Sequence, residues 1–129
     1  MKRKLPTILL MVLALTACTS PASESVSYRQ IPMQDAIQLM KTETDYVILD
    51  VRTPSEYAQG HIPGAILVPN ETIGTDDIPQ LSRKDQLLLV YCRSGNRSKQ
   101  ASEKLAQLGY TNVVEFGGIN QWPGEIVTD

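Results

Sequence analysis

The sequence predicts an α/β fold in which helices cover both faces of a parallel sheet. Short apolar runs alternate along the chain with segments whose apolar residues recur at helical spacing, which is typical of such folds. The run at residues 87–91 is apolar throughout, as expected for a strand covered on both faces. The chain has 129 residues, which favours one domain.

Composition excludes several classes of protein. Hydrophobic residues make up 42% and charged residues 20%, which is ordinary for a globular protein with a core. The chain has 12 basic and 14 acidic side chains, a balance that argues against a nucleic-acid-binding face. Two cysteines and one histidine are too few for a structural zinc site, and they allow at most one disulfide. We expect a monomer with no metal ion, no other cofactor and no nucleic-acid partner.

Residues 1–17 predict an export signal. Residues 2–4 are basic, and residues 8–15 form an apolar run that is too short for a membrane-spanning helix of about 20 residues. The ending Leu15-Thr16-Ala17-Cys18 resembles a bacterial lipobox, which implies cleavage before Cys18 and attachment of lipid to it. An ordinary secretory signal and a retained membrane anchor are the alternatives.

Residues 18–27 predict a flexible tether between the lipid and a folded domain at residues 28–129. The tether contains four serines, a proline and an alanine, without apolar periodicity. The expected location is therefore the bacterial cell envelope, with the domain held to a membrane by its lipid. Thr19 rather than aspartate follows Cys18. In a cell with two membranes, this favours the periplasmic side of the outer membrane.

The folded domain is expected to begin with a strand, a helix and a second strand. Residues 28–31 fit a short strand, and Pro32 is suited to open a helix. The apolar residues of that helix recur on one face: Met33, Ala36, Ile37 and Met40. Residues 46–49 form an apolar run without alternation, which predicts a buried strand that ends at Asp50.

A second helix and a third strand follow. Thr53 is suited to be an N-cap, Pro54 follows at the first helical position, and Glu56 completes a capping box. Gly60 is expected to end this helix. A strand at residues 65–68 then stops at a proline.

The last third of the domain contains a loop, two strands and a helix. Residues 70–86 are rich in Asp, Gly and Pro and predict a loop with at most one helical turn. After the strand at 87–91 and a short polar turn, Ala101, Leu105 and Leu108 mark one face of a helix that Gly109 ends. Residues 113–116 predict a final strand, ended by two glycines.

The residues with the clearest chemistry follow the strand at 87–91, in the run Cys92-Arg93-Ser94-Gly95-Asn96-Arg97-Ser98. Ligands bind at the carboxyl ends of strands in open α/β sheets. Small and basic residues before a helix allow backbone N–H groups, the helix dipole and two arginines to stabilise a thiolate and bind an anion. These effects would lower the pKa of Cys92. The alternative is an inert core cysteine, which would not need six following residues without a large apolar side chain.

Several segments together resemble the single-domain rhodanese-like sulfurtransferases. The matching segments run in family order: Leu49-Asp50-Val51-Arg52, Glu56-Tyr57, Gly60-His61-Ile62-Pro63-Gly64-Ala65, residues 90–98, and Phe116-Gly117-Gly118 with Trp122. The one small departure is Phe116, where the family often has leucine. The resemblance implies a three-layer α/β/α domain with a five-stranded sheet of order 3-2-4-5-1.

The resemblance also implies a reaction. Cys92 would carry sulfur as a persulfide inside the loop, with the amides of residues 93–98 pointing inward. Its thiolate would take sulfur from an anionic donor such as thiosulfate and pass it to cyanide or a thiol in a ping-pong cycle. In this reading Cys92 is catalytic, and Arg93, Ser94, Gly95, Asn96, Arg97 and Ser98 bind the substrate.

Two other functions remain open from the sequence. Cysteine-based phosphatases and arsenate reductases use a similar loop, but in phosphatases the spacing between cysteine and arginine is one residue longer than the four residues between Cys92 and Arg97. A smaller ring suits a sulfur atom better than a phosphate. A non-catalytic binding module is the second alternative, although such modules commonly lose the cysteine.

Other conspicuous residues are expected to support the structure. Asp50 should accept hydrogen bonds from the backbone or from Arg52, and Arg52 and Glu56 are candidate partners at the start of the second helix. His61 is more suited to fixing a turn than to acting as a base, because a thiolate stabilised by a loop needs none. Trp122 is expected in the core or at the rim of the pocket. Lys99 and Glu103 form an exposed helical pair.

Overall fold

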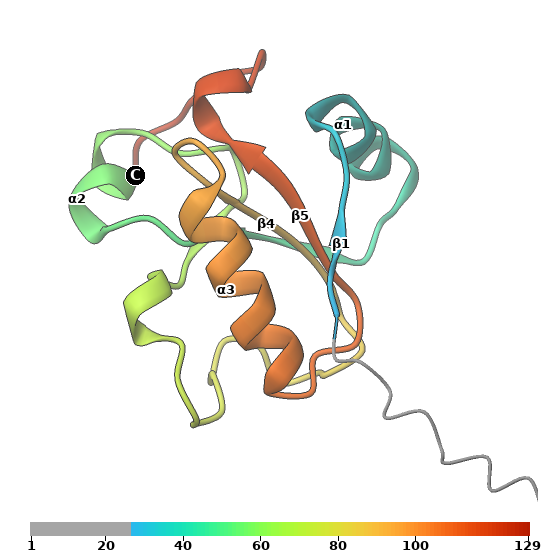
Figure 1. Cartoon of the computed structure of the whole chain (residues 1–129). Coiled ribbons are helices and arrows are strands. Elements are labelled where there is room, and N and C mark those ends of the chain that lie inside the picture. The colour runs from blue at the N-terminus through green and yellow to red at the C-terminus, as the bar shows by residue number, and fades with distance from the viewer. Residues whose placement is uncertain (1–26) are drawn as a thin grey trace, which may run out of the picture.

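The computed structural model describes residues 27–129 (Figure 1). The predicted signal peptide, the lipidation site Cys18 and nearly all of the tether lie outside the described residues, so these expectations remain predictions. Among the described residues, no helix has the length and apolar character needed to cross a membrane.

The described residues form one five-stranded sheet. Its strands are β1 (Arg29–Gln30), β2 (Tyr46–Asp50), β3 (Ile66–Leu67), β4 (Leu87–Cys92) and β5 (Val113–Gly118). The strand order is β1-β5-β4-β2-β3, and every neighbouring pair is parallel. Counted from the other edge, this is the expected order 3-2-4-5-1. The long strand β4 lies at the centre, which places its carboxyl end in the middle of one edge of the sheet.

Three helices surround the sheet (Figure 1). They are α1 (Met33–Thr42), α2 (Pro54–Gln59) and α3 (Asn96–Gln107). The helices α1 and α3 pack on opposite faces, which confirms the three-layer arrangement. Two short 3-10 turns follow strands at η1 (Asn70–Thr72) and η2 (Ile119–Gln121), and η1 is the single turn expected in the long loop.

The capping box that begins α2 forms as its sequence predicts. The Glu56 N–H donates to Thr53 Oγ1 at 3.3 Å, and the Thr53 N–H donates to Glu56 Oε1 at 3.4 Å. Pro54 occupies the first helical position, where its missing N–H costs nothing. Local chemistry therefore sets where this helix begins.

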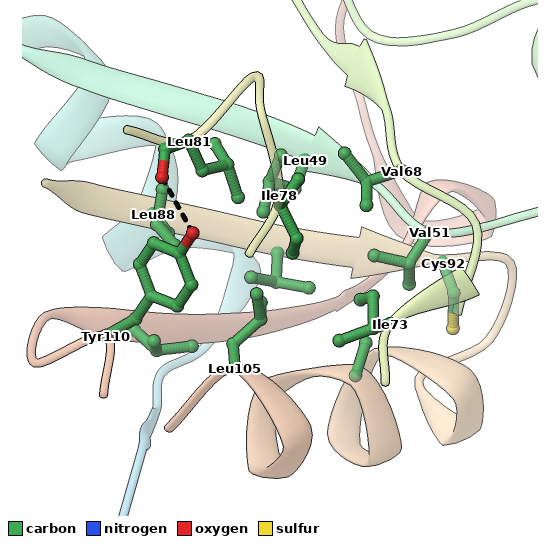
Figure 2. Packing of buried hydrophobic residues seen from close by; sticks show 13 residues of the cluster. Leu49, Val51, Val68, Ile73, Ile78, Leu81, Leu88, Cys92, Leu105 and Tyr110 are labelled. Atoms are coloured by element: carbon green, nitrogen blue, oxygen red, sulfur yellow. Dashed lines mark hydrogen bonds between the residues drawn. The ribbon is translucent and has the colours of Figure 1, made fainter. Parts of the chain in front are cut away.

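Alternate side chains of β4 enter two separate cores. Leu88, Val90 and Cys92 belong to the core between the sheet and α3, whereas Leu89 and Tyr91 belong to the core on the α1 side. Figure 2 shows the α3-side core, where the Tyr110 hydroxyl also donates to the Leu81 carbonyl at 2.7 Å. Both faces of β4 are buried, which is why its sequence is an unbroken apolar run.

The last strand is longer than the sequence pattern predicts. The expected end before the two glycines is wrong, because β5 continues through Gly117 and Gly118. Gly118 pairs with Cys92, and a Cβ atom on Gly118 would lie 2.1 Å from the Arg93 carbonyl oxygen. The second glycine therefore lets β5 approach the backbone of the loop that follows β4, instead of ending the strand.

Candidate active site

Cys92 lies at the carboxyl end of β4, where the chain turns into α3. The residue is 1% exposed, and its sulfur points from the strand toward the helix that follows (Figure 2). The Gly95 N–H donates to Cys92 Sγ at 3.0 Å. Gly95 has φ 110°, a left-handed conformation that glycine adopts without strain, and this turn directs its N–H at the sulfur.

The surroundings of Cys92 favour the thiolate. Burial by itself raises the pKa of the thiol, but hydrogen bonds from the Ser98 hydroxyl and from the backbone N–H groups of Ser98, Gly95 and Ser94 lower it. The net result is a pKa of Cys92 below its usual value. The structure thus agrees with the expectation that a loop of amides at a helix N-terminus activates this cysteine.

Ser98 joins the loop to the neighbouring strand. Its hydroxyl oxygen lies 3.4 Å from Cys92 Sγ, 2.9 Å from the Gly95 carbonyl oxygen and 2.6 Å from Glu115 Oε1. Glu115 is on β5 and is only 3% exposed. The sequence analysis does not identify Glu115 as a site residue, although a charged residue inside a strand expected to be buried is a signal in itself.

Arg97 is held away from the solvent side of the loop by Glu56. Its guanidinium donates to both carboxylate oxygens, at 2.6 and 2.9 Å. This pair lowers the pKa of Glu56 to about 2. Arg97 therefore serves partly to fix α2 against the start of α3, which differs from the expectation that its charge faces only the substrate.

Arg52 does not form the expected pair with Glu56. Its guanidinium Nη2 instead donates to Asp50 Oδ2 and to the Gly60 carbonyl oxygen, both at 2.7 Å, and the Arg52 N–H donates to Asp50 Oδ1 at 3.0 Å. The Tyr91 hydroxyl donates to Asp50 Oδ2 at 2.6 Å. Asp50 is fully buried, so its charge has to be matched inside the protein, and Arg52 is the nearest cation.

Arg93 lies at the mouth of the site. It is exposed, and within residues 27–129 it forms no ion pair. It lines a cavity of about 380 Å³ with Arg52, Glu56 and Asn120. Ser94 and Asn96 are exposed as well, whereas Gly95 and Ser98 are buried beside Cys92. The loop therefore presents one unpaired cation to solvent and keeps its hydrogen-bond donors inside.

The other predicted support residues lie beyond the loop. His61 Nδ1 lies 3.0 Å from the Tyr57 carbonyl oxygen, and its ring stacks on the Tyr57 ring at 3.8 Å, which fits the expected role in a turn. Trp122 is half-buried against the α1-side core, and its indole N–H donates to the Glu125 carbonyl at 3.0 Å. In the described part of the chain, no group of three His, Cys, Asp or Glu side chains is placed to hold a metal ion.

Residues 33–125 match the family described as Rhodanese-like domain. The chain belongs to the rhodanese-like family. The match covers every strand of the domain except β1 and includes the whole loop from Cys92 to Ser98.

Named relatives and solved structures agree with this assignment. A sulfurtransferase of Allochromatium vinosum is 40% identical over 96 residues, which are 72% of this chain and 86% of that protein. Thiosulfate sulfurtransferase PspE of Escherichia coli is 38% identical over 71 residues, 55% of this chain and 68% of that protein. A rhodanese-related protein of Thermoplasma volcanium superposes with a TM-score of 0.66 at 33% identity, covering 79% of this chain and all of that one.

Proposed function

We propose that this rhodanese-like domain is a sulfurtransferase that moves sulfane sulfur from an anionic donor such as thiosulfate to a thiophilic acceptor. The observation that carries the proposal is the buried Cys92 sulfur, which receives the Gly95 N–H at 3.0 Å and has a lowered pKa. Relatives named as sulfurtransferases support the same class of enzyme.

In the first half of the reaction, the Cys92 thiolate attacks the outer sulfur of thiosulfate. A bond forms between Sγ and that sulfur, the S–S bond of thiosulfate breaks, and sulfite leaves with the bonding electron pair. The cysteine then carries a persulfide. Arg93, at the mouth of the site, is placed to attract the anionic donor and to stabilise the departing sulfite.

In the second half, a nucleophilic acceptor attacks the outer sulfur of the persulfide. With cyanide, a C–S bond forms, the S–S bond breaks, and the electron pair returns to Cys92 as thiolate while thiocyanate leaves. The amide donors that lower the pKa of Cys92 also stabilise this leaving thiolate. The same loop therefore assists both half-reactions.

The decisive experiment is the intact mass of the protein after thiosulfate treatment, with and without cyanide. The protein should gain the mass of one sulfur atom, and cyanide should remove it. Cys92→Ser should show neither change, and serine is close enough in size for the fold to survive. Absence of the mass gain in wild type would favour a non-catalytic binding module.

A second assay separates the proposal from phosphate chemistry. The protein should form thiocyanate from thiosulfate and cyanide and should hydrolyse aryl phosphates poorly. The four residues between Cys92 and Arg97 form a ring that suits a single sulfur atom. Efficient phosphatase activity without thiocyanate formation would overturn the sulfurtransferase assignment.

We also propose that the domain is tethered to a membrane of the bacterial cell envelope through lipid on Cys18. The lipobox-like ending at residues 15–18 and the serine-rich segment after it support this proposal. Cys18→Ser should abolish lipid labelling and release the protein from membranes. Membrane association of the unprocessed form of this variant would indicate a retained helical anchor instead.

A further inference from the structure

Three buried polar side chains form a continuous row behind the loop. Cys92 Sγ, Ser98 Oγ and Glu115 Oε1 are joined by contacts of 3.4 and 2.6 Å. The three residues are 1%, 0% and 3% exposed, respectively. The first lies on β4, the second on α3 and the third on β5, so the row crosses from the central strand to its neighbour through the helix.

The proton of the Ser98 hydroxyl can serve only one of its two ionisable neighbours at a time. When Ser98 donates to the Glu115 carboxylate, its oxygen can only accept from Cys92, which must then be a thiol. When Ser98 donates to a Cys92 thiolate, its oxygen faces Glu115 Oε1 at 2.6 Å, and that contact is attractive only if Glu115 donates a proton to it. Each arrangement therefore fixes the protonation of both ends.

We propose that Glu115 is the internal proton acceptor for Cys92, acting through the Ser98 hydroxyl. The Cys92 thiol gives its proton to Ser98 Oγ while Ser98 gives its own proton to Glu115, so a thiol and a carboxylate become a thiolate and a carboxylic acid. No proton or charge leaves the buried cluster. This inference rests on the proposed function, because the thiolate is the form that attacks the sulfur donor.

The environment of the cluster favours such an internal transfer. Adding a second negative charge beside a buried carboxylate is costly, whereas moving one proton along the row keeps the net charge constant. The lowered pKa of Cys92 depends in part on donation from the Ser98 hydroxyl, which is the second arrangement. The Gly117 N–H donates to Glu115 Oε1 at 2.9 Å and orients the carboxyl group in either state.

Glu115 also has a route to solvent that does not pass through the substrate entrance. It lines a second cavity of about 380 Å³, together with Ser94, Gly95, Lys99 and Gln121. The cavity that Arg93 and Arg52 line shares none of these residues. A proton held on Glu115 can exchange with water on this side while the donor occupies the other. Because Glu115 acts through Ser98, it is a positioning residue for the proton and not a catalytic residue.

Other charged groups near the cluster must be considered in any pH experiment. Arg97, which is paired with Glu56, interacts with the Cys92 charge, and Lys99 lines the same cavity as Glu115. On the sheet side, Asp50 is paired with Arg52. The variants below leave all of these groups in place.

The test is the pH dependence of Cys92 alkylation by iodoacetamide in the full-length chain, resolved by peptide mass so that Cys18 does not contribute. The wild-type rate should rise in two steps separated by a plateau, because Cys92 and Glu115 first share the loss of one proton and lose the second only at higher pH. Glu115→Gln keeps the size and the acceptor oxygen, and it should show a single step.

Two further variants define the connection. Ser98→Ala should also lose the lower step, although Glu115 is present, because the hydroxyl that links the two groups is gone. Glu103→Gln removes an exposed carboxylate of α3 and should keep both steps. A single step in wild type, or a lower step that survives in Glu115→Gln or Ser98→Ala, would overturn the proposal.

An infrared measurement covers the case in which the Glu115 variant does not fold. Wild type at neutral pH should show the carbonyl band of a protonated buried carboxyl group, and Cys92→Ser should lack it because serine cannot give up a proton. Absence of this band in wild type, or its persistence in Cys92→Ser, would contradict the proposal. Neither the alkylation nor the infrared result depends on sulfur transfer, so a protein that forms no persulfide would refute the proposed function and still test the proton acceptor.

Discussion

Glu56 and Arg97, which are 41 residues apart, form an ion pair with two hydrogen bonds of 2.6 and 2.9 Å. Glu56 belongs to the capping box that begins α2, and Arg97 lies in the first turn of α3. One carboxylate thus stabilises a helix start and fixes the loop that contains Cys92. The chemistry of the loop depends on a residue from a different helix.

This pair should make stability depend on pH in the acid range. Hydrogen bonds from Arg97 are the main cause that lowers the pKa of Glu56 from 4.5 to about 2. A lowered pKa in the folded state contributes stability that is complete above pH 4.5 and is lost as the pH falls to about 2. Glu56→Gln should therefore reduce the free energy of unfolding by about 1 kcal/mol at neutral pH, as expected for a partly exposed pair.

Urea denaturation at a series of pH values measures this effect. The difference between wild type and Glu56→Gln should shrink toward zero as the pH falls to about 2. Glu71→Gln, a change at an exposed residue of η1, should show no such pH-dependent difference. A constant difference for Glu56→Gln across the range would mean that the charge of this carboxylate contributes nothing.

Arg93 should govern the salt dependence of thiosulfate use, because it is the exposed cation of the loop. Arg93→Ala should raise KM for thiosulfate a few-fold, in line with about 0.5–1 kcal/mol for an exposed charge. It should also weaken the inhibition that added salt causes by screening. Lys41→Ala, an exposed charge at the end of α1, should leave both properties unchanged. An unaltered salt response in Arg93→Ala would show that the backbone amides bind the anion without it.

Gly118 should be intolerant of any side chain. A Cβ atom there would lie 2.1 Å from the Arg93 carbonyl oxygen, so alanine must push β5 away from the loop. We expect Gly118→Ala to lower the free energy of unfolding by about 3 kcal/mol or more and to slow alkylation of Cys92. Gly74→Ala, where no atom lies within 4 Å of the new Cβ, should leave stability nearly unchanged. Equal stability of the two variants in urea would contradict the close approach.

The Tyr91 hydroxyl should contribute more to stability than its single atom suggests. It donates to Asp50 Oδ2 at 2.6 Å and accepts the Ile62 N–H at 3.1 Å, and all three residues are buried. Tyr91→Phe leaves both partners without this bond and should cost about 1–3 kcal/mol of unfolding free energy. Tyr28→Phe removes a hydroxyl that bonds only to exposed Gln30 and should cost almost nothing. A similar effect of both changes in thermal denaturation would exclude a special role for the buried network.

Local chemistry accounts for what the sequence predicts well. The capping box at Thr53 and Glu56, the left-handed Gly109 after α3 and the apolar run of β4 each depend on residues that are neighbours in the chain. The position of Cys92 between a buried strand and a helix is local in the same sense, and the confirmed strand order came from the family resemblance. The expected end of the last strand is wrong because local pattern cannot show that Gly118 meets Arg93.

The sequence by itself determined the activated cysteine, because strand, loop and helix follow one another within a few residues around Cys92. Only the tertiary structure decided that Glu56 pairs with Arg97 and not with Arg52, and that Glu115 lies behind Ser98. Both contacts join segments that are distant along the chain. They depend on which strands are neighbours and on which face of β5 each side chain occupies, and a shift of one residue in β5 would turn Glu115 away from α3.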